Sequence, residues 1–118
     1  MGDARGLGRS GEDAAAGYLS AHGMSVVARN WRCRGGEIDI IALDGRTLVF
    51  CEVKTRRGVG FGSPLDAITR VKQARLRRLA SAYLAEVGGH PGPIRIDAVG
   101  IVWSARDHLE IRHERGVA

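Results

Sequence analysis

Apolar and polar residues alternate through residues 37–54, which read EIDIIALDGRTLVFCEVK. Two alternating runs joined by Asp44-Gly45 predict a β-hairpin, because Asp-Gly is the strongest short-range signal for a tight two-residue turn. A turn made by these two residues also fixes which positions of the two strands face each other. In the predicted register Ile41 faces Leu48, Asp39 faces Phe50 and Glu37 faces Glu52.

Successive side chains of a strand point to opposite faces, so the hairpin has one uniformly apolar face. That face carries Ile38, Ile40, Ala42, Val49, Cys51 and Val53. The other face is apolar near the turn and charged at the far end, where it carries Glu37, Asp39, Glu52 and Lys54. In this register Asp39 and Glu52 are diagonal neighbours, with Cα atoms about 7 to 8 Å apart.

Residues with helical spacing follow Ser10. The segment Ser10-Gly11-Glu12-Asp13 resembles a capping box and predicts a helix from Ser10 to about His22, preceded by a loose arm at residues 1–9. Glu12 falls on the same stripe as Ala15, Ala16 and Leu19, so it points toward the packed side. The alternative for Glu12 is that it complements the helix dipole, which contributes about 0.3 to 1 kcal/mol.

A second helix is predicted from Ser63-Pro64 to about Val87, closed by Gly88-Gly89. Lys72 occupies a slot on its apolar stripe, between Ile68 and Leu76. Either the stem of Lys72 lies along the core with its ammonium in solvent, or the side chain is directed to the charged end of the hairpin. A break near residues 69–71 would change that geometry.

Shorter patterns complete the chain. Residues 24–29 predict a strand, residues 55–63 a glycine-rich loop, residues 94–103 a strand covered on both faces, and residues 108–113 an edge strand. The predicted order is therefore α-β-β-β-α-β-β within one domain at residues 1–118. The first three strands suit an antiparallel meander, and the long helix suits a crossover to a parallel neighbour. We expect an α/β fold with a mixed sheet flanked by helices.

The chain carries a net charge of +5, which favours a polyanionic partner, nucleic acid first. Candidate phosphate contacts are Arg56, Arg57, Arg70, Lys72 and Arg75. No segment approaches the roughly 20 apolar residues of a membrane span, and the first residues lack a signal-peptide core. We therefore expect a cytoplasmic protein with no membrane partner. The two cysteines form no disulfide framework or zinc pattern, and Cys51 suits a buried position.

The charged end of the hairpin suggests metal chemistry. Asp39 and Glu52 repel each other unless a proton or a cation lies between them, and oxygen ligands with open water positions suit Mg²⁺ or Mn²⁺. Lys54, on the same face, adds a positive charge that can orient a nucleophile or stabilise charge on a phosphate. The alternative is a surface patch in which Lys54 pairs with Glu52.

A resemblance to known proteins extends this hypothesis. Asp39 followed by Glu52-Val53-Lys54 resembles the D...(D/E)xK core of the PD-(D/E)xK nuclease superfamily, although Ile38 stands where its name has proline. The segments GEDAAAGYL, RNWRCRGGEIDIIALDG, LVFCEVKTR, SPLDAI and IRIDAV together resemble the YraN family of small bacterial proteins over nearly the whole chain. That family is similar to archaeal Holliday junction resolvases.

The resemblance implies a restriction-endonuclease-like core and a role for each matching residue. Asp39 and Glu52 would bind the metal, the Val53 carbonyl would add a ligand, Lys54 would be the catalytic lysine, and Glu12 would join the site from the first helix. The expected function is metal-dependent hydrolysis of DNA, on branched or structured substrates in repair or recombination. Two alternatives are a nucleic-acid-binding protein without turnover and a module that binds an acidic protein. A homodimer is compatible with the sequence.

Overall fold

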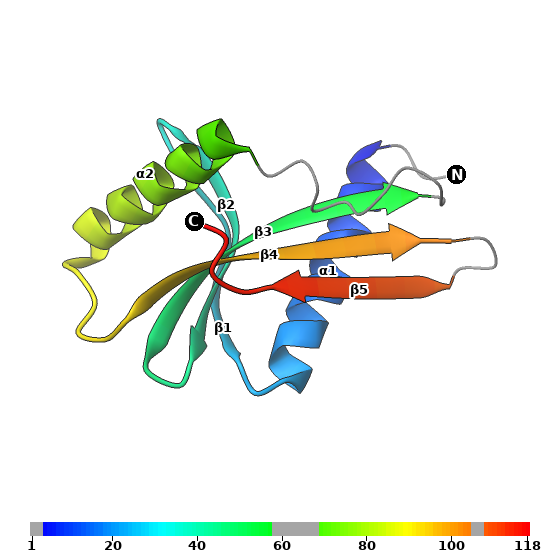
Figure 1. Cartoon of the computed structure of the whole chain (residues 1–118), viewed down its shortest axis with the longest axis horizontal. Helices are drawn as coiled ribbons and strands as arrows, with labels where there is room; N and C mark the ends of the chain where they lie inside the picture. Colours follow the sequence, from blue (N-terminus) through cyan, green and yellow to red (C-terminus); the bar gives the residue numbers. More distant parts are fainter. Residues whose placement is uncertain (1–3, 58–68, 105–107) are drawn as a thin grey trace.

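The computed structural model describes residues 4–57, 69–104 and 108–118, with the backbone alone for residues 4–9 and for Arg57. The elements are α1 (Ala4–Ala21), β1 (Ser25–Cys33), β2 (Gly36–Asp44), β3 (Thr47–Arg57), α2 (Arg70–Val87), β4 (Ile94–Trp103) and β5 (Leu109–Glu114), as Figure 1 shows. The predicted order α-β-β-β-α-β-β is confirmed. Neither described helix is long and apolar enough to cross a bilayer.

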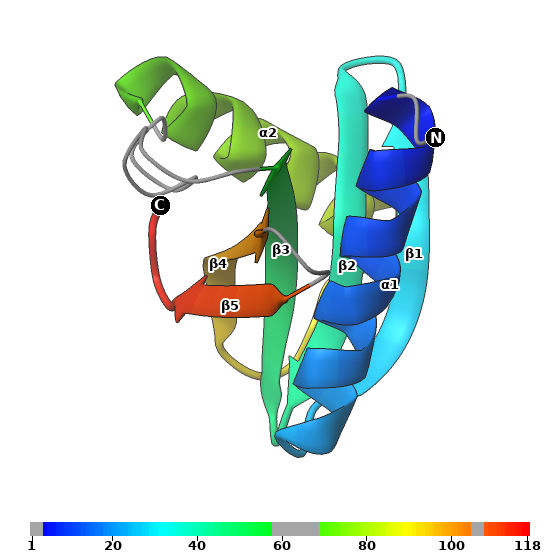
Figure 2. The same ribbon diagram turned by 90° about the vertical axis from the view of Figure 1, so that its right-hand side faces the viewer.

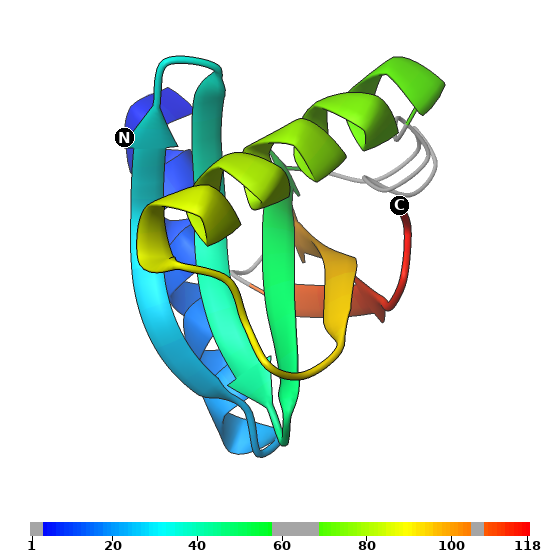
Figure 3. The ribbon, with the colours of Figure 1, turned by 90° about the vertical axis from the view of Figure 1, so that its left-hand side faces the viewer.

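The five strands form one mixed sheet in the order β1-β2-β3-β4-β5. The first three strands and the β4–β5 pair are antiparallel, whereas β3 and β4 are parallel. The connection between β3 and β4 contains α2, so the predicted crossover is confirmed. Figures 2 and 3 show the two helices on opposite faces of the sheet, with α1 running along β1 and β2 and α2 crossing the other face.

Each helix closes a separate part of the core. On the α1 face the buried cluster contains Ala15, Leu19, Met24, Ile40, Ala42, Val49, Cys51, Val99 and Ile101. On the α2 face it contains Ile38, Ile41, Leu48, Phe50, Leu76, Leu79, Ala80 and Ile96. Burial raises the pKa of the Cys51 thiol to about 12, which agrees with the buried position predicted for it. The sheet, and β3 at its centre, is therefore shielded on both sides.

The helix starts differ from the predictions. The first helix begins at Ala4, so the predicted start at Ser10 is wrong, and residues 4–9 belong to α1. Gly11 is buried against Thr55 of β3, and this packing favours helical backbone through a residue of low propensity. The second helix is capped by Thr69, whose side chain accepts a hydrogen bond from the Lys72 amide at 3.2 Å.

The Thr69 cap begins a helix within residues 69–71, where a break in the second helix was considered from the sequence. The predicted opening at Ser63 and Pro64, and the stripe positions Leu65 and Ile68, lie outside the described residues. At the other end, Gly88 has φ 85° and caps α2 as predicted.

The predicted hairpin is present, but its register is wrong by two residues. Thr47 pairs with Asp44, and Leu48 with Leu43, so the two-residue turn consists of Gly45 and Arg46. Gly45 has φ 61°, which suits a turn that needs positive φ at its first central residue only. Because the shift is even, the face assigned to each position near the turn is unchanged.

Alternation along β2 is interrupted near Asp39. Ile38 packs in the cluster on the α2 face, so its predicted place beside Ile40 is wrong. The interruption lies opposite Asn30 of β1, which has φ 53°, the one positive value among the described residues other than glycine. The ladder between β2 and β3 runs only from the turn to the Ile40–Cys51 pair. The two strands therefore part where the charged residues begin.

The remaining strands are close to the predicted ones. The first strand extends to Cys33, beyond the predicted residues 24–29, because Trp31, Arg32 and Cys33 pair with β2. The third strand continues to Arg57, so the predicted loop at residues 55–63 begins later, and residues 58–63 lie outside the described chain. The last two strands agree with the predicted spans within one residue.

Candidate active site

Asp39 and Glu52 come together where β2 and β3 part. Ile40 pairs with Cys51, so Asp39 and Glu52 are the next residues along the two strands. Oδ2 of Asp39 accepts a hydrogen bond from the backbone N–H of Val53 at 2.7 Å. This hydrogen bond from the backbone of β3 to a side chain of β2 fixes the Asp39 carboxylate against the neighbouring strand.

Four carboxylates interact at this point. The pKa of Asp39 is raised to about 6, first because the group is largely buried and then because the charges of Glu12, Glu52 and Glu37 are close. The N–H of Val53 acts in the opposite direction but does not outweigh them. The structure therefore brings the three predicted carboxylates together, with Glu37 as a fourth.

Asn30 joins two of these carboxylates. Its amide nitrogen donates to Oε2 of Glu12 at 2.9 Å and to Oε1 of Glu37 at 3.0 Å. Sequence reasoning missed this residue. The available signal was an asparagine between two alternating strand segments, since Asn tolerates positive φ better than most residues. Asn30 links α1 to β2 across the edge of the candidate site.

The approach of α1 to the sheet places Glu12. A Cβ on Gly11 would collide with the side chain of Thr55, the residue that follows Lys54. One turn later Ala15 is fully buried, and Asp13 forms an ion pair with Arg29 of β1 at 2.7 Å. Glu12 thus points toward the packed side, as the stripe predicts.

Glu52 and Lys54 form an ion pair within the site. Nζ of Lys54 lies 3.2 Å from Oε1 of Glu52, which is the pairing that the surface-patch alternative expects. The other oxygen, Oε2 of Glu52, is buried and has no hydrogen-bond partner among the described residues. A buried carboxylate oxygen without a donor is costly, so this atom is suited to accept a cation or a donor from a ligand.

A narrow cleft connects these strands with α2. It is lined by Glu37, Glu52, Lys72, Arg75, Leu76 and Leu79. The pKa of Lys72 is lowered, first because the charge of Lys54 is close. Of the two orientations considered for Lys72, the structure shows the one directed to the charged end of the hairpin.

The predicted phosphate contacts are distributed unevenly around the cleft. Arg75 lines it, and Arg70 is exposed at the first residue of α2. Arg56 is partly buried on β3, two residues beyond Lys54, and the side chain of Arg57 lies outside the described part. Of these predicted contacts Lys72 and Arg75 share the cleft with Glu37 and Glu52, and Arg32 of β1 adds an ion pair with Glu37 at 3.6 Å.

The carboxylates fit a metal that keeps several waters. Among the described residues, no three His, Cys, Asp or Glu side chains form a preassembled cation site. Mg²⁺ is typically held by one or two carboxylates plus water and substrate oxygens. Because Asp39 Oδ2 accepts the Val53 N–H and Glu52 Oε1 pairs with Lys54, one oxygen of each carboxylate is left for a cation. The Val53 carbonyl stays a predicted ligand.

The fold and the site define a class of protein: a mixed five-stranded α/β sheet with carboxylates and a lysine gathered where the second and third strands part. Comparison with known proteins assigns the family. The model of the Uncharacterised protein family UPF0102 matches residues 11–101, and the chain belongs to this YraN-like family. The matched span includes Glu12, Asp39, Glu52 and Lys54.

Several relatives match over nearly their full length. A UPF0102 protein of Streptomyces griseus is 56% identical over 118 residues, covering 98% of this chain and 99% of the relative. One of Parafrankia sp. is 53% identical over 110 residues, and one of Beutenbergia cavernae is 50% identical over 111 residues. The alignments cover 93% and 94% of both chains, respectively.

Proposed function

We propose that this protein is a divalent-metal-dependent nuclease that hydrolyses phosphodiester bonds in DNA, with branched or structured DNA of repair or recombination as the expected substrate. The observation that carries the proposal is the grouping of Asp39, Glu52 and Lys54. In it a buried oxygen of Glu52 lacks a partner among the described residues, and a lysine lies beside the carboxylates. The resemblance to PD-(D/E)xK nucleases supports the same roles.

Asp39 and Glu52 would hold Mg²⁺ or Mn²⁺ through their free oxygens. The chemistry that such a cation supplies is polarisation of a phosphate oxygen and a lower pKa for a bound water. Asp39 must be deprotonated to take part, which requires a pH above its pKa of about 6 or a cation that displaces the proton. Glu12, held by Asn30, adds negative charge to the same place.

Lys54 would serve the reacting phosphate. Its ammonium lies 3.2 Å from Glu52 and can turn toward a substrate oxygen to stabilise developing negative charge, or orient the attacking water. Lys72 and Arg75 on the facing helix would bind the phosphate backbone, assisted by Arg56, Arg57 and Arg70. These contacts position the strand without selecting its sequence.

A second candidate function is nucleic-acid binding without turnover. The observation that favours it is the Lys54–Glu52 ion pair, which can satisfy both groups as a structural contact. A protein of this kind binds DNA with strong salt dependence, and EDTA leaves the binding unchanged.

Cleavage assays separate the two functions. Wild type, Asp39→Asn and Lys54→Ala are compared on duplex, single-stranded and four-way DNA with Mg²⁺, with Mn²⁺ and with EDTA. We expect metal-dependent cleavage by the wild type and a loss of about 100-fold or more in each variant, since Asp39→Asn removes a ligand of the cation and Lys54→Ala removes a group that acts on the reacting phosphate. Calorimetric titration with Mn²⁺ should show weaker binding by Asp39→Asn and retained binding by Lys54→Ala.

The matched control is Asp13→Asn, which removes an exposed carboxylate of the same helix that carries Glu12. It should cleave at the wild-type rate. Equal cleavage by all four proteins would identify a contaminating nuclease and refute the proposal. Salt-sensitive binding with no cleavage under any metal condition would favour the binding protein.

A further inference from the structure

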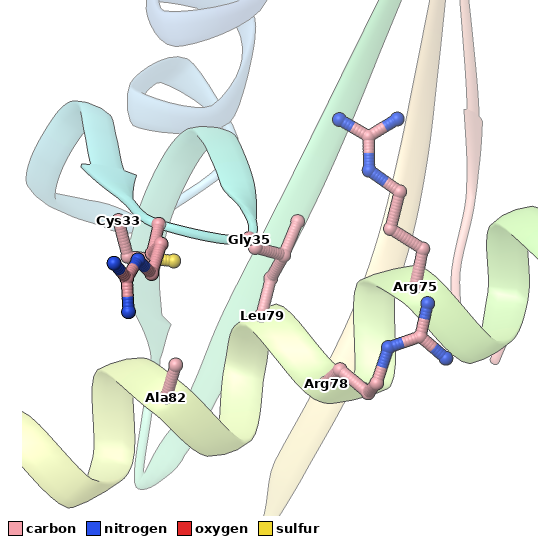
Figure 4. Close-up of a pocket in the computed structure, with 7 residues that line it drawn as sticks. Cys33, Gly35, Arg75, Arg78, Leu79 and Ala82 are labelled. Atoms are coloured by element: carbon pink, nitrogen blue, oxygen red, sulfur yellow. The ribbon is translucent and has the colours of Figure 1, made fainter.

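A cavity of about 270 Å³ lies between the β1–β2 turn and α2, on the α2 side of the sheet. Its lining surface is almost entirely apolar and comes from Cys33, Leu79 and Ala82 and from the stems of the exposed side chains Arg34, Arg75 and Arg78. Figure 4 shows Leu79 directed from α2 toward Gly35, with Cys33 and Ala82 on one side and the two labelled arginines on the other. The cavity is thus an apolar hollow bordered by arginine side chains.

The turn backbone shapes one wall of this cavity. Gly36 has φ 142°, and a Cβ added there would lie 2.9 Å from Nη2 of Arg75 and 3.5 Å from Leu79. At Gly35 a Cβ would lie 3.7 Å from Leu79. The positive φ of Gly36 favours glycine at this turn, and the Arg75 guanidinium and Leu79 of α2 lie against it.

The arginines around the cavity are available to bind an anion. Within the described chain, none of the three arginines forms an ion pair, whereas Arg29, Arg32, Arg95 and Arg112 do. Exposed arginine side chains bordering an apolar hollow favour a ligand that has a flat apolar body for the hollow and a negative charge at its edge. A nucleotide combines these properties. A volume slightly below the usual range of about 300 to 1,000 Å³ for small-molecule pockets suits a single base.

The cavity also adjoins the candidate active site. Arg75 and Leu79 line both this cavity and the cleft that contains Glu37, Glu52 and Lys72. A ligand that fills the cavity therefore contacts two residues that also line the cleft of Glu37 and Glu52. A single strand can place one base in the cavity and the adjacent phosphate beside Arg75.

We propose that this cavity binds an unpaired nucleotide of the substrate strand, with the base against Leu79 and Ala82 and the phosphate beside Arg75 and Arg78. A paired base must first be unpaired and unstacked, at a cost of a few kcal/mol, so a substrate that already carries an unpaired nucleotide next to the scissile phosphate is preferred. The inference rests on the proposed nuclease function and adds to it a substrate class. It assigns Arg78 to recognition of the strand.

Binding in EDTA tests this without cleavage. Fluorescence anisotropy compares a duplex with an unpaired nucleotide at a gap, the fully paired duplex, and the gapped duplex with an abasic site at the unpaired position. We expect the wild type to prefer the gapped duplex by about tenfold, and the abasic substitution to remove most of that preference. Ala82→Phe, which fills the cavity, should have the same effect as the abasic substitution.

Arg78→Ala has a matched control in Arg77→Ala, because both arginines are exposed on the same helix and only Arg78 lines the cavity. Arg78→Ala should weaken binding to the gapped duplex and lower the slope of log affinity against log salt by about 0.7 to 0.9, the value for one phosphate contact. Arg77→Ala should retain the wild-type slope. Circular dichroism melting checks that each variant is folded, and the Arg78→Ala comparison stands if Ala82→Phe does not fold.

Two results would overturn the proposal: equal affinity for the gapped and abasic substrates, or equal losses in Arg77→Ala and Arg78→Ala. Either would assign the arginines of α2 to a general basic surface. The nuclease proposal is judged separately in the cleavage assay. Cleavage by a protein that binds the gapped and abasic substrates equally refutes only the proposed role of the cavity. A preference for the gapped duplex over the abasic one, without cleavage, refutes only the proposed nuclease activity.

Discussion

Two aspartates of the same sheet have pKa values shifted in opposite directions. Asp97 is fully buried, and burial acts to raise its pKa, but hydrogen bonds from Arg95, His113 and the Gly116 amide lower it below the usual value. Asp39 accepts one hydrogen bond and is surrounded by other carboxylates, so its pKa is raised. The partners, rather than the degree of burial, decide which carboxylate is available for a cation.

The raised pKa of Asp39 predicts a pH-dependent stability. The native state holds the proton up to about pH 6, whereas the unfolded state releases it near 3.8. Stability therefore falls as pH rises from about 4 to about 6, since the native state binds more protons in that window. Asp39→Asn removes the effect, and we expect it to exceed the wild type by about 2 kcal/mol in unfolding free energy at about pH 7.5, measured by urea denaturation in EDTA.

The same two proteins should have nearly equal stability at about pH 4, where Asp39 is protonated in the native state. Asp13→Asn, an exposed carboxylate, provides the control and should follow the wild type at each pH. A constant difference across the whole pH range would show that the amide acts through packing or hydrogen bonding and not through the charge of Asp39.

Residue positions were predictable where local rules decide them. The period of two placed Asp39 and Glu52 near each other at the far end of the hairpin, and an even register error left this intact. The register itself depends on Asp44, which pairs with Thr47 and forms an ion pair with Arg95 at 3.1 Å. A partner 51 residues away along the chain is not visible in a turn motif.

At the scale of elements, helix ends were predictable when glycine or a polar cap decides them locally. Gly88 ends α2 as expected, because its positive φ is the usual end of a helix. The start of α1 was not predictable from Ser10, because Gly11 owes its place in the helix to the contact with Thr55. Thr55 lies far from Gly11 in the sequence, and only the fold brings the two residues together.

This contact predicts different effects for two glycines of one helix. Gly11→Ala forces a Cβ into the Thr55 side chain, and we expect it to lower the unfolding free energy by about 1 to 3 kcal/mol. Gly17→Ala adds a Cβ that has no atom within 4 Å, so it should raise stability by about 0.5 to 1 kcal/mol through helix propensity. Thermal and urea unfolding measure both.

Gly11→Ala should also move Glu12 away from Asn30, whereas Gly17→Ala should not. Chemical shifts of the Asn30 side-chain amide report that movement. Stabilisation by both substitutions would contradict the close approach of α1 to β3.

At the scale of the molecule, the order of elements, the meander of the first three strands and the parallel crossover followed from the sequence because the connections are short or contain a helix. The convergence of three elements on one site could only be anticipated from side chains that interrupt apolar stripes, namely Glu12 and Lys72. The cavity beside α2 had no such signal, since it arises from the contact of a glycine turn with Arg75.

The buried Asp97 joins distant parts of the chain. Arg95 binds both Asp97 and Asp44 of the hairpin, while His113 of β5 donates to Asp97 at 2.8 Å. Asp97→Asn leaves the guanidinium of Arg95 without its buried carboxylate partner, and we expect a loss of about 3 kcal/mol in unfolding free energy near neutral pH. Because the native pKa is lowered, this loss should diminish as pH falls below about 4.

Urea denaturation at several pH values measures the change. Glu110→Gln removes one partner of an exposed ion pair with Arg112 and should cost less than about 0.5 kcal/mol. A small effect of Asp97→Asn at neutral pH would mean that neutral hydrogen bonds suffice to hold β5 and the hairpin together.

The amide of Asn30 has a consequence for the electric field at the end of β2. Both of its N–H groups are engaged, one by Glu12 and one by Glu37, yet the amide has no net charge. It holds two anions at fixed positions without neutralising them, which a lysine or arginine at the same place would do. The countercharge at this place comes instead from Arg32, which pairs with Glu37, and from Lys54, which pairs with Glu52. The uncharged amide therefore leaves the negative charge of Glu12 available to attract a small cation to this end of β2, in a protein whose net charge is +5.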